Sequence, residues 1–334
     1  RVISSKKEFN VKKFFMQWEW ALVVLIIAVN IVNARISPYY LSVDSLLGAT
    51  MVFLDKAFIV LPMTFIIILG DIDISVASTM ALSSVLMAVS YNAGVSMPVA
   101  ILIALLTGTV CGFINGYIIS RFKELSAMIV TLATMSIYRG IAYVILGDQA
   151  SGGFPSWFSE LGWGYVGNTD IPIILAVFVI FSVVFGILLH RTTFGRRVYA
   201  IGNNIYASTY SGVSVGNIKT VVFTITGIMS AIAGIFLTSK LGSSRPNIAT
   251  GYELEVIAIT VLGGIHPSGG RGRIIGAVLS VFLVGLMRYG MGLKNISGQV
   301  MMIIIGALLI IAIMMPNILG KVNIRKKNII KSKA

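Results

Sequence analysis

The stretch Val99–Ile119, VAILIALLTGTVCGFINGYII, runs for 21 residues without a charged side chain. A lipid hydrocarbon core about 30 Å thick takes roughly 20 apolar residues in a helix, so this stretch predicts a membrane-spanning helix. Within it, Gly108, Gly112 and Gly116 recur at every fourth position. That spacing places a stripe of small residues on one helix face, where a second helix can approach closely.

Apolar runs of this kind recur throughout the 334 residues, of which 57% are hydrophobic and 11% charged. Because soluble domains are about a quarter charged, this composition excludes an ordinary water-soluble protein. We expect an all-α fold, a polytopic membrane protein of about ten transmembrane helices. The other nine expected spans are Trp18–Val32, Met51–Leu69, Ser75–Val89, Ala127–Leu146, Ile171–Leu189, Val221–Thr238, the short Leu254–Leu262, Ile274–Tyr289 and Val300–Met315.

The charge distribution predicts the orientation of these spans. Lys and Arg number 26 against 12 Asp and Glu, a formal net charge of +14. With both termini in the cytoplasm, 19 of the 26 basic residues fall in inside segments, as the positive-inside rule requires. Residues 1–17 and 316–334 are then basic cytoplasmic tails around a transmembrane domain at 18–315. We expect the tails to attract anionic membrane lipid and no nucleic acid, since no aromatic and basic platform accompanies them.

Two long connections separate the spans. On the inside, a loop at about 195–219 contains Asn203 and Asn204, which can cap a short helix, and Gly212, which can end it. A docked partner or a simple surface turn would each explain this segment. On the outside, Gly147–Asp170 is rich in glycine and aromatic residues, which fits either an interfacial aromatic belt or a surface that receives a partner.

Two similar breaks interrupt the apolar runs on the inside: LGDIDIS at Leu69–Ser75 and LGGIHPS at Leu262–Ser268. They share Leu, Gly, Ile and Ser at matched positions, which suggests an internal duplication of the kind found in transporters. Asp71 and Asp73 precede the third span, where a carboxylate can accept backbone N–H groups at a positive helix end. We expect this capping role rather than ion binding or a proton relay.

Other charges also lie in or beside apolar runs, where they are costly and need a reason: Asp55, Lys56, Arg139, Glu253, Glu255 and Arg288. Glu253 and Glu255 precede the eighth span and are expected to act as Asp71 and Asp73 do. Arg139 lies midway along the fifth span and is expected to pair with one of these acids.

Enzyme signatures are missing from the sequence. There is no GxSxG, no HExxH and no GxxxxGK[ST] phosphate loop, and Cys111 is the single cysteine. We therefore expect no catalytic residues, no metal site and no cofactor in this chain. If transport is driven by ATP, a partner ATPase must bind the ATP and Mg²⁺.

Four stretches resemble a known family. They are PMTFIIILGDIDIS at Pro62–Ser75, Tyr138–Gly140, Gly195–Gly212 and Ser239–Gly276, the last containing LGSSRPNIATGYELEVIAITVLGG and SGGRG. The chain resembles the permease subunits of bacterial sugar importers of the ATP-binding cassette (ABC) type, those for ribose, xylose, galactose, arabinose, rhamnose and autoinducer 2. The resemblance covers roughly residues 45–315. It departs from the family at Asp71, which replaces a glycine, and at Asn204–Tyr206, where the family tends to carry acids.

The resemblance implies a permease of the bacterial cytoplasmic (inner) membrane that works with a second copy or a close paralogue. Two ATP-binding subunits would dock on the cytoplasmic loops, and an extracytoplasmic sugar-binding protein would deliver a monosaccharide or a related small polyol. Transport would proceed by alternating access, driven by the ATPase. The residues implied in the ATPase-coupling loop are Asn203, Asn204, Tyr206, Ala207 and Gly212.

The resemblance also marks a set of signature and helix-breaking residues. These are Gly70, Asp71, Asp73, Ser75, Arg139, Gly251, Glu253, Gly263, Gly264, Gly269 and Gly270. Polar residues within spans are candidates for a translocation path or for helix packing: Asn115, Thr131, Thr134 and Gln299.

Two other functions fit a membrane protein of this composition. An ATPase-independent secondary transporter or channel would place ionisable residues face to face at mid-membrane, and Asp55 and Arg139 are the best candidates. A membrane enzyme of lipid or glycan metabolism would need clustered histidines or acids in a loop. The resemblance implies that much of the substrate selectivity resides in the separate binding protein, and within the family we expect a pentose, a deoxyhexose such as rhamnose, or autoinducer 2.

Overall fold

A computed structural model describes residues 18–301, 303–304, 306–307 and 310 of the chain. The two basic tails and part of the tenth expected span lie outside these residues. In the described part, the elements are α2 (Trp18–Ile36), α3 (Val43–Ile68), α4 (Val76–Asn92), α5 (Met97–Arg121), α6 (Ala127–Leu146), β1 (Ser151–Gly152), α7 (Ser156–Trp163), α8 (Ile173–Arg191), α9 (Thr193–Asn203), α10 (Ile205–Tyr210), α11 (Val215–Leu241), β2 (Ser243–Ser244), α12 (Tyr252–Leu262) and α13 (Ile274–Leu293).

The all-α membrane fold is confirmed, but the described residues contain seven helices long and apolar enough to cross a membrane. These are α2, α3, α5, α6, α8, α11 and α13. The expected third span is α4, an apolar helix of 17 residues. The expected eighth span is α12, whose 11 residues extend roughly 16 Å at 1.5 Å per residue, about half of a bilayer core. Of the tenth span, the described residues are helical.

Several helices extend beyond the apolar runs that predicted them. The helix expected at Met51 begins at Val43, where Ser42 Oγ accepts a hydrogen bond from the backbone N–H of Ser45 at 3.2 Å. The helix expected to begin at Val221 begins at Val215 and ends at Leu241. A helix continues beyond the hydrocarbon region as long as its ends are capped or solvated, so hydropathy underestimates its length.

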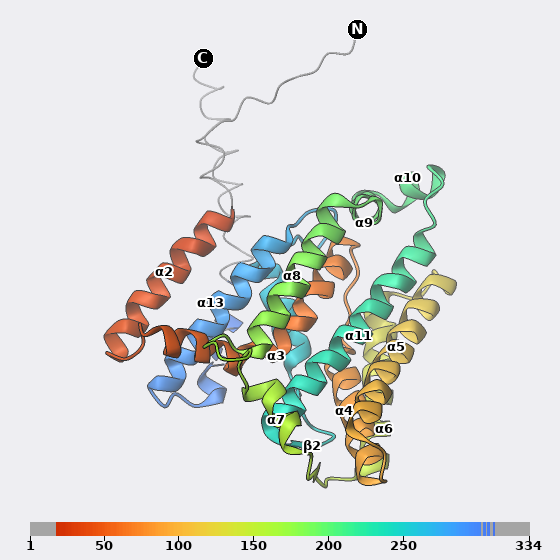
Figure 1. Cartoon of the computed structure of the whole chain (residues 1–334). Coiled ribbons are helices and arrows are strands. Elements are labelled where there is room, and N and C mark those ends of the chain that lie inside the picture. Colours follow the sequence, from red (N-terminus) through yellow and green to blue (C-terminus); the bar gives the residue numbers. More distant parts are fainter. Residues whose placement is uncertain (1–17, 302, 305, 308–309, 311–334) are drawn as a thin grey trace, which may run out of the picture.

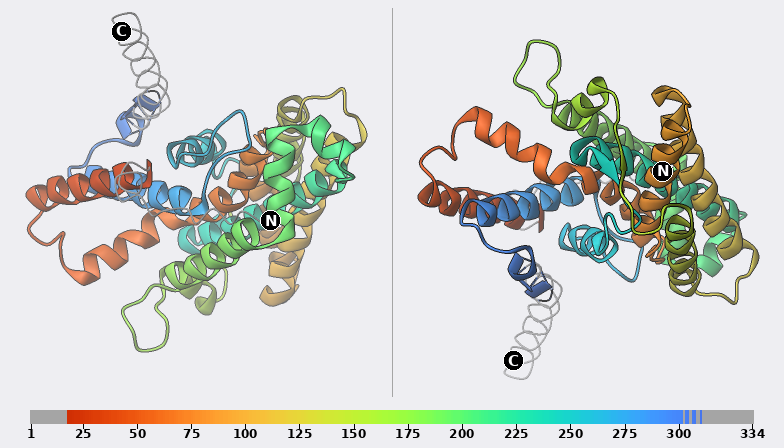
Figure 2. Two further views of the ribbon diagram at one scale, coloured as in Figure 1. Left: turned by 90° about the horizontal axis from the view of Figure 1, so that it is seen from above. Right: turned by 90° about the horizontal axis from the view of Figure 1, so that it is seen from below.

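Helix α3 forms the centre of the bundle. Nearly all of its apolar length is buried, as expected for a helix that is hydrophobic on every side. Phe58 of α3 stacks on Phe236 of α11 with ring centroids 5.0 Å apart, and its ring edge meets Phe178 of α8 at 5.9 Å. In both views of Figure 2, α2 lies at one edge of the bundle and α5 and α6 lie at the opposite edge.

The glycine stripe of α5 packs against α11, as the sequence predicted. A Cβ atom on Gly112 would lie 3.0 Å from Thr224 Cα, and one on Gly116 would lie 2.7 Å from Thr220 Cα. Gly227 of α11 faces Gly108 and Gly112 in return. The two backbones therefore touch, and any side chain in the stripe would separate them.

The two ends of the bundle carry different structures (Figure 1). Helices α9 and α10 lie at one end, and α7 and β2 lie at the other. At the second end, β1 pairs antiparallel with β2, and Trp163 Nε1 of α7 donates to the Lys240 carbonyl at 2.9 Å. The aromatic-rich connection is thus partly folded onto α11, with Phe158 buried and Trp157 exposed.

Candidate functional site

The two breaks predicted from LGDIDIS and LGGIHPS lie against each other at the α9 end of the bundle. The backbone N–H of Gly270 donates to the Ile68 carbonyl at 2.8 Å. A Cβ on Gly269 would lie 3.0 Å from Gly70 N. Gly70, Gly269 and Gly270 all have φ between 73° and 83°, a backbone conformation that favours glycine. The signature glycines therefore form the joint between the two breaks.

The last turn of α9 completes this joint. Asn203 Nδ2 donates to Tyr199 O at 2.8 Å and to Gly270 O at 3.4 Å. Tyr199 Oη donates to Gly272 O at 2.7 Å, and burial raises the pKa of Tyr199 to about 12. A Cβ on Gly202 would overlap the Ile68 carbonyl and lie 2.6 Å from Gly270 N. We call this contact of α9 with both breaks the inner junction.

Helix α10 projects from the inner junction with little cover. Asn204 is its N-cap, and its side chain accepts a hydrogen bond from the Ala207 N–H at 2.9 Å. Asn203, expected to share the capping, is instead the last residue of α9. Gly212, with φ of 80°, follows α10 after Ser211. Tyr206 and Tyr210 are 77% and 92% exposed, so α10 presents two aromatic side chains outward.

Asp71 in the first break forms an ion pair with Lys219 of α11. This ion pair links the break to α11. Asp71 Oδ2 lies 2.7 Å from Lys219 Nζ, and both side chains are nearly buried. Burial raises the pKa of Asp71, and the adjacent Lys219 opposes that shift. Both residues line a cavity of about 690 Å³ next to Tyr206 and Tyr210. Asp71 therefore forms an ion pair instead of capping α4, and Lys219 is a member of the site that the sequence did not single out.

Asp73 is the acid that supports the start of α4. Its Oδ1 accepts hydrogen bonds from the Ser75 N–H at 2.8 Å and the Ser75 hydroxyl at 2.7 Å. Burial raises the pKa of Asp73 to about 6, and the Ser75 hydrogen bonds oppose that shift. Asn115 Nδ2 donates to Ser75 Oγ at 2.8 Å, and Tyr138 Oη donates to Asn115 Oδ1 at 3.1 Å. Side chains of α5 and α6 therefore fix the first break through hydrogen bonds.

Three of the candidate path residues belong to this cluster. Asn115, Thr131 and Thr134 are all at most 5% exposed. Thr131 Oγ1 accepts a hydrogen bond from the Ile74 N–H at 3.2 Å, and Thr134 Oγ1 donates to Thr131 O at 3.3 Å. These contacts give the three side chains a packing role at the break, and their place in a translocation path stays a prediction.

Replacing Asp73 by alanine is expected to destabilise the protein by about 2–3 kcal/mol, because it leaves the Ser75 N–H and hydroxyl without an acceptor in a buried site. Asp73→Asn retains one acceptor oxygen and is expected to cost less than half as much. Thermal unfolding of the purified variants in detergent measures both. Equal stability of Asp73→Ala and the unmodified chain would contradict the supporting role.

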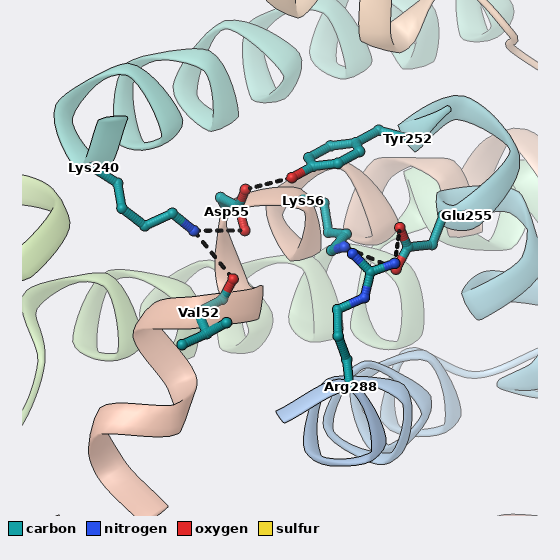
Figure 3. A network of polar contacts seen from close by, with 7 residues as sticks. All are labelled: Val52, Asp55, Lys56, Lys240, Tyr252, Glu255 and Arg288. Atoms are coloured by element: carbon teal, nitrogen blue, oxygen red, sulfur yellow. Dashed lines mark hydrogen bonds and ion pairs between the residues drawn. The ribbon is translucent and has the colours of Figure 1, made fainter. Parts of the chain in front are cut away.

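A second polar region lies on the opposite half of α3 and joins four helices (Figure 3). Glu255 of α12 contacts two cations: Lys56 Nζ at 2.8 Å and an Arg288 nitrogen at 3.0 Å. Asp55 is 3.4 Å from Lys240 Nζ and accepts a hydrogen bond from Tyr252 Oη at 3.1 Å. The Lys56 side chain is 4% exposed and that of Asp55 is fully buried. We call these six residues the charge network.

The charge network changes two expectations. Glu255 was expected to cap α12, but it pairs with Lys56 and Arg288. Arg139 was expected to pair with an acid. Its guanidinium donates to the carbonyls of Pro246 and Ile248 at 2.5 and 2.8 Å, and Glu253 is the acid whose charge attracts it, without a direct ion-pair contact. Asp55 and Arg139 therefore do not form the facing pair that a secondary transporter would need. Glu253 lies in the first turn of α12, and its buried Oε2 has no hydrogen-bond partner among the described residues.

Signature glycines delimit α12 beside the network. Gly251 has φ of 89° and is the N-cap, while Gly263 and Gly264 follow the last residue. A Cβ on Gly263 would lie 2.7 Å from Ala277 Cα, so only a glycine lets the end of α12 touch α13. The short helix is therefore fixed at its C-terminal end and bounded by a turn at its N-terminal end.

A cavity of about 740 Å³ adjoins α12 and α13. Among its described lining residues are Thr250, Tyr252, Glu255, Arg288 and Gln299. Gln299 is the one candidate path residue that the structure brings to this cavity. Because Glu255 is already neutralised by Lys56 and Arg288, the wall offers hydroxyl, amide and paired charged groups. Such groups can exchange hydrogen bonds with the hydroxyls of a neutral ligand.

Comparison with known proteins adds an independent finding. A family model described as branched-chain amino acid transport system, permease component, matches residues 45–313. The autoinducer 2 import system permease protein LsrD of Escherichia coli strain K12 is 34% identical over 305 residues, which cover 89% of this chain and 91% of that protein. The protein of the same name from Shigella flexneri has the same identity and coverage. No solved structure matches the chain.

Proposed function

The chain belongs to the family of permease components of branched-chain amino acid type transport systems, and we propose that it translocates a small neutral polyol. As a permease subunit of an ABC importer, it is a multi-pass protein of the bacterial cytoplasmic membrane. The polyol would be a monosaccharide or a molecule similar to autoinducer 2. The relatives in Escherichia coli and Shigella flexneri are named for the import of autoinducer 2.

The observation that carries this proposal is the α12 cavity, in whose described lining the one acid, Glu255, is already held by the two cations Lys56 and Arg288. A branched-chain amino acid has a free ammonium group, and burying that group needs an acid that is free to pair with it. In the cavity wall, Glu255 and Arg288 are already paired with each other at 3.0 Å. The hydroxyls of Thr250 and Tyr252 already donate to Asn247 O and Asp55, so their oxygens remain as acceptors for a ligand hydroxyl, and Gln299 supplies a neutral amide. This chemistry favours a polyol over an amino acid.

The proposed assembly contains partners that bind at the two ends of the bundle. A second copy or paralogue would complete the translocation path. An extracytoplasmic binding protein would deliver the substrate at the α7 and β2 end. ATP-binding subunits would dock at α9 and α10, which would place this end of the bundle in the cytoplasm. Both termini would be cytoplasmic as well. ATP and Mg²⁺ would be held by those subunits, and their closure would displace α9 at the inner junction.

Replacing Tyr210 by aspartate is expected to lower uptake at least tenfold. The side chain is 92% exposed, so the substitution should leave stability within about 0.5 kcal/mol. A buried carboxylate in the docking surface would, however, oppose binding of the ATPase. Tyr210→Phe keeps the aromatic contact and is the matched control.

Uptake of labelled ribose, rhamnose and autoinducer 2 by proteoliposomes that contain the complete importer, with and without enclosed ATP, measures this effect. Full uptake by Tyr210→Asp, or equal losses in both variants, would contradict docking at α10. Uptake without ATP would contradict the ABC mechanism itself and would favour a secondary transporter. In that case the ionisable residues of the charge network would be the candidates for coupling transport to an ion.

A further inference from the structure

A groove of about 770 Å³ runs between α8 and α13 and shares no described lining residue with the cavity at Asp71 or the cavity at α12. The two helices lie side by side (Figure 1). The floor of the groove contains Phe178 and Phe282, whose rings meet edge to face with centroids 6.3 Å apart. Exposed aliphatic side chains form its walls: Val179, Val183, Ile187 and Ile275.

One end of this groove is basic. His190 and Arg191 occupy the last turn of α8, and Arg273 precedes the first residue of α13. None of the described lining residues is acidic. The nearest described counter-charge is Glu19 of α2, whose Oε1 lies 3.3 Å from the guanidinium of the largely exposed Arg273. Among the described residues at this mouth, Arg191 and Arg273 outnumber the single acid, Glu19.

The histidine at this mouth has a defined orientation. Its Nε2 accepts a hydrogen bond from the Ile274 N–H at 3.4 Å, and its ring stacks on Tyr199 of α9 with centroids 6.4 Å apart. An Nε2 that accepts leaves the proton of a neutral ring on Nδ1. His190 can therefore donate a hydrogen bond to an oxygen anion while it remains uncharged.

The length of the groove matches one leaflet. From Phe178 to His190, α8 rises roughly 18 Å at 1.5 Å per residue. Half of a hydrocarbon core about 30 Å thick is of the same order. An apolar groove of this length with a basic mouth combines the two features of an anionic phospholipid: an acyl chain and a phosphate. Basic pockets between helices on the cytoplasmic side bind such headgroups.

We propose that the groove between α8 and α13 binds an anionic phospholipid of the cytoplasmic leaflet, with an acyl chain along Phe178 and Phe282 and its phosphate at His190, Arg191 and Arg273. The assignment to the cytoplasmic leaflet rests on the orientation given under the proposed function. The lipid would connect α8 and α13 next to α9, which follows α8 directly in the chain.

The chain offers matched variants for both parts of the lipid. Gly186 lines the groove, and a Cβ there would meet nothing within 4 Å, so Gly186→Leu adds a side chain to the groove at a position with room for its Cβ. Gly140 on α6 has the same open surroundings, and Gly140→Leu is its control. For the headgroup, Arg191→Gln removes one charge, and Arg121→Gln removes an arginine from the corresponding last turn of α5.

Native mass spectrometry of the full chain in detergent, titrated with dioleoyl phosphatidylglycerol or dioleoyl phosphatidylcholine, tests the proposal. We expect phosphatidylglycerol to bind at least fivefold more tightly than phosphatidylcholine. Gly186→Leu should weaken phosphatidylglycerol binding at least tenfold, and Arg191→Gln about fivefold. Gly140→Leu and Arg121→Gln should change neither affinity. Circular dichroism of each variant verifies its fold.

Equal binding of the two lipids, or equal losses in the control variants, would overturn the proposal. So would complete disulfide cross-linking of a Val183→Cys variant in membranes, because a second copy would then cover the groove. The titration contains no ATP, ATPase or sugar, so its failure is separate from failure of the permease function. Labelling of a Tyr210→Cys variant by an impermeant maleimide in intact cells tests the orientation separately, and labelling there would overturn the leaflet assignment.

Discussion

Replacing Glu255 by alanine is expected to lower the free energy of unfolding by about 3–5 kcal/mol. This carboxylate is shared by Lys56 at 2.8 Å and Arg288 at 3.0 Å. Its removal leaves the ammonium of Lys56, 4% exposed, without its ion-pair partner. A buried cation that loses its partner keeps the whole desolvation cost and gains nothing in return.

Thermal and denaturant unfolding in detergent measure the loss of stability. Two further variants serve as controls. Glu160→Ala removes an exposed acid from the α7 segment and should change stability by less than about 0.5 kcal/mol. Lys56→Met combined with Glu255→Ala removes both buried charges and should recover at least half of the loss. Arg288, at 25% exposure, can still reach water. A loss below about 1 kcal/mol in the single variant would show that Asp55 already compensates Lys56.

The sequence predicted the residues of the charge network better than it predicted their partners. Charges within apolar runs are costly, and this marked Asp55, Lys56, Glu255 and Arg288 as residues that need a reason. Their pairing could not be predicted, because Lys56 and Glu255 are 199 positions apart and helices α3 and α12 meet only in the folded bundle. Arg139, marked by the same argument, binds backbone carbonyls.

The contacts of the inner junction could not be predicted from the sequence either, because they are made by backbone groups. The two glycine breaks are visible in the sequence, because glycines interrupt apolar runs there. Their contact with each other and with α9 depends on carbonyl groups of ordinary residues such as Ile68, which no sequence pattern distinguishes. Hydropathy also missed the start of α3, which the Ser42 side chain caps, and both ends of α11, whose last turn ends at Gly242 in a left-handed conformation. The short α12 was predicted, because an apolar run between Gly251 and Gly263 is visible.

Helix α3 connects the two regions physically. Its inner end supplies the Ile68 carbonyl to the junction, and Lys56 lies 12 residues earlier, roughly 18 Å away along the axis. Pro62 lies between these two points and removes one backbone hydrogen bond of the helix. Nearly the whole apolar length of α3 is nevertheless buried, and close packing on every side limits how far its two halves can bend against each other. A displacement of α9 by an ATPase would therefore reach the charge network and α12 through α3.

Replacing Gly202 by alanine is consequently expected to reduce uptake at least a hundredfold. The new Cβ would overlap the Ile68 carbonyl and lie 2.6 Å from Gly270 N, so α9 could no longer approach both breaks. Within a helix, glycine to alanine otherwise adds up to about 1 kcal/mol of stability. The expected loss therefore comes from the junction and not from the helix.

The control for this variant is Gly48→Ala on α3, where a Cβ meets nothing within 4 Å. Uptake by proteoliposomes with the ATPase, together with copurification of the ATPase, separates the steps. We expect Gly202→Ala to retain its thermal transition within a few degrees, since the membrane helices keep their own contacts, while ATP hydrolysis no longer responds to substrate. Wild-type uptake by Gly202→Ala would show that the junction tolerates displacement, and the path from α9 through Ile68 to α3 would then be wrong.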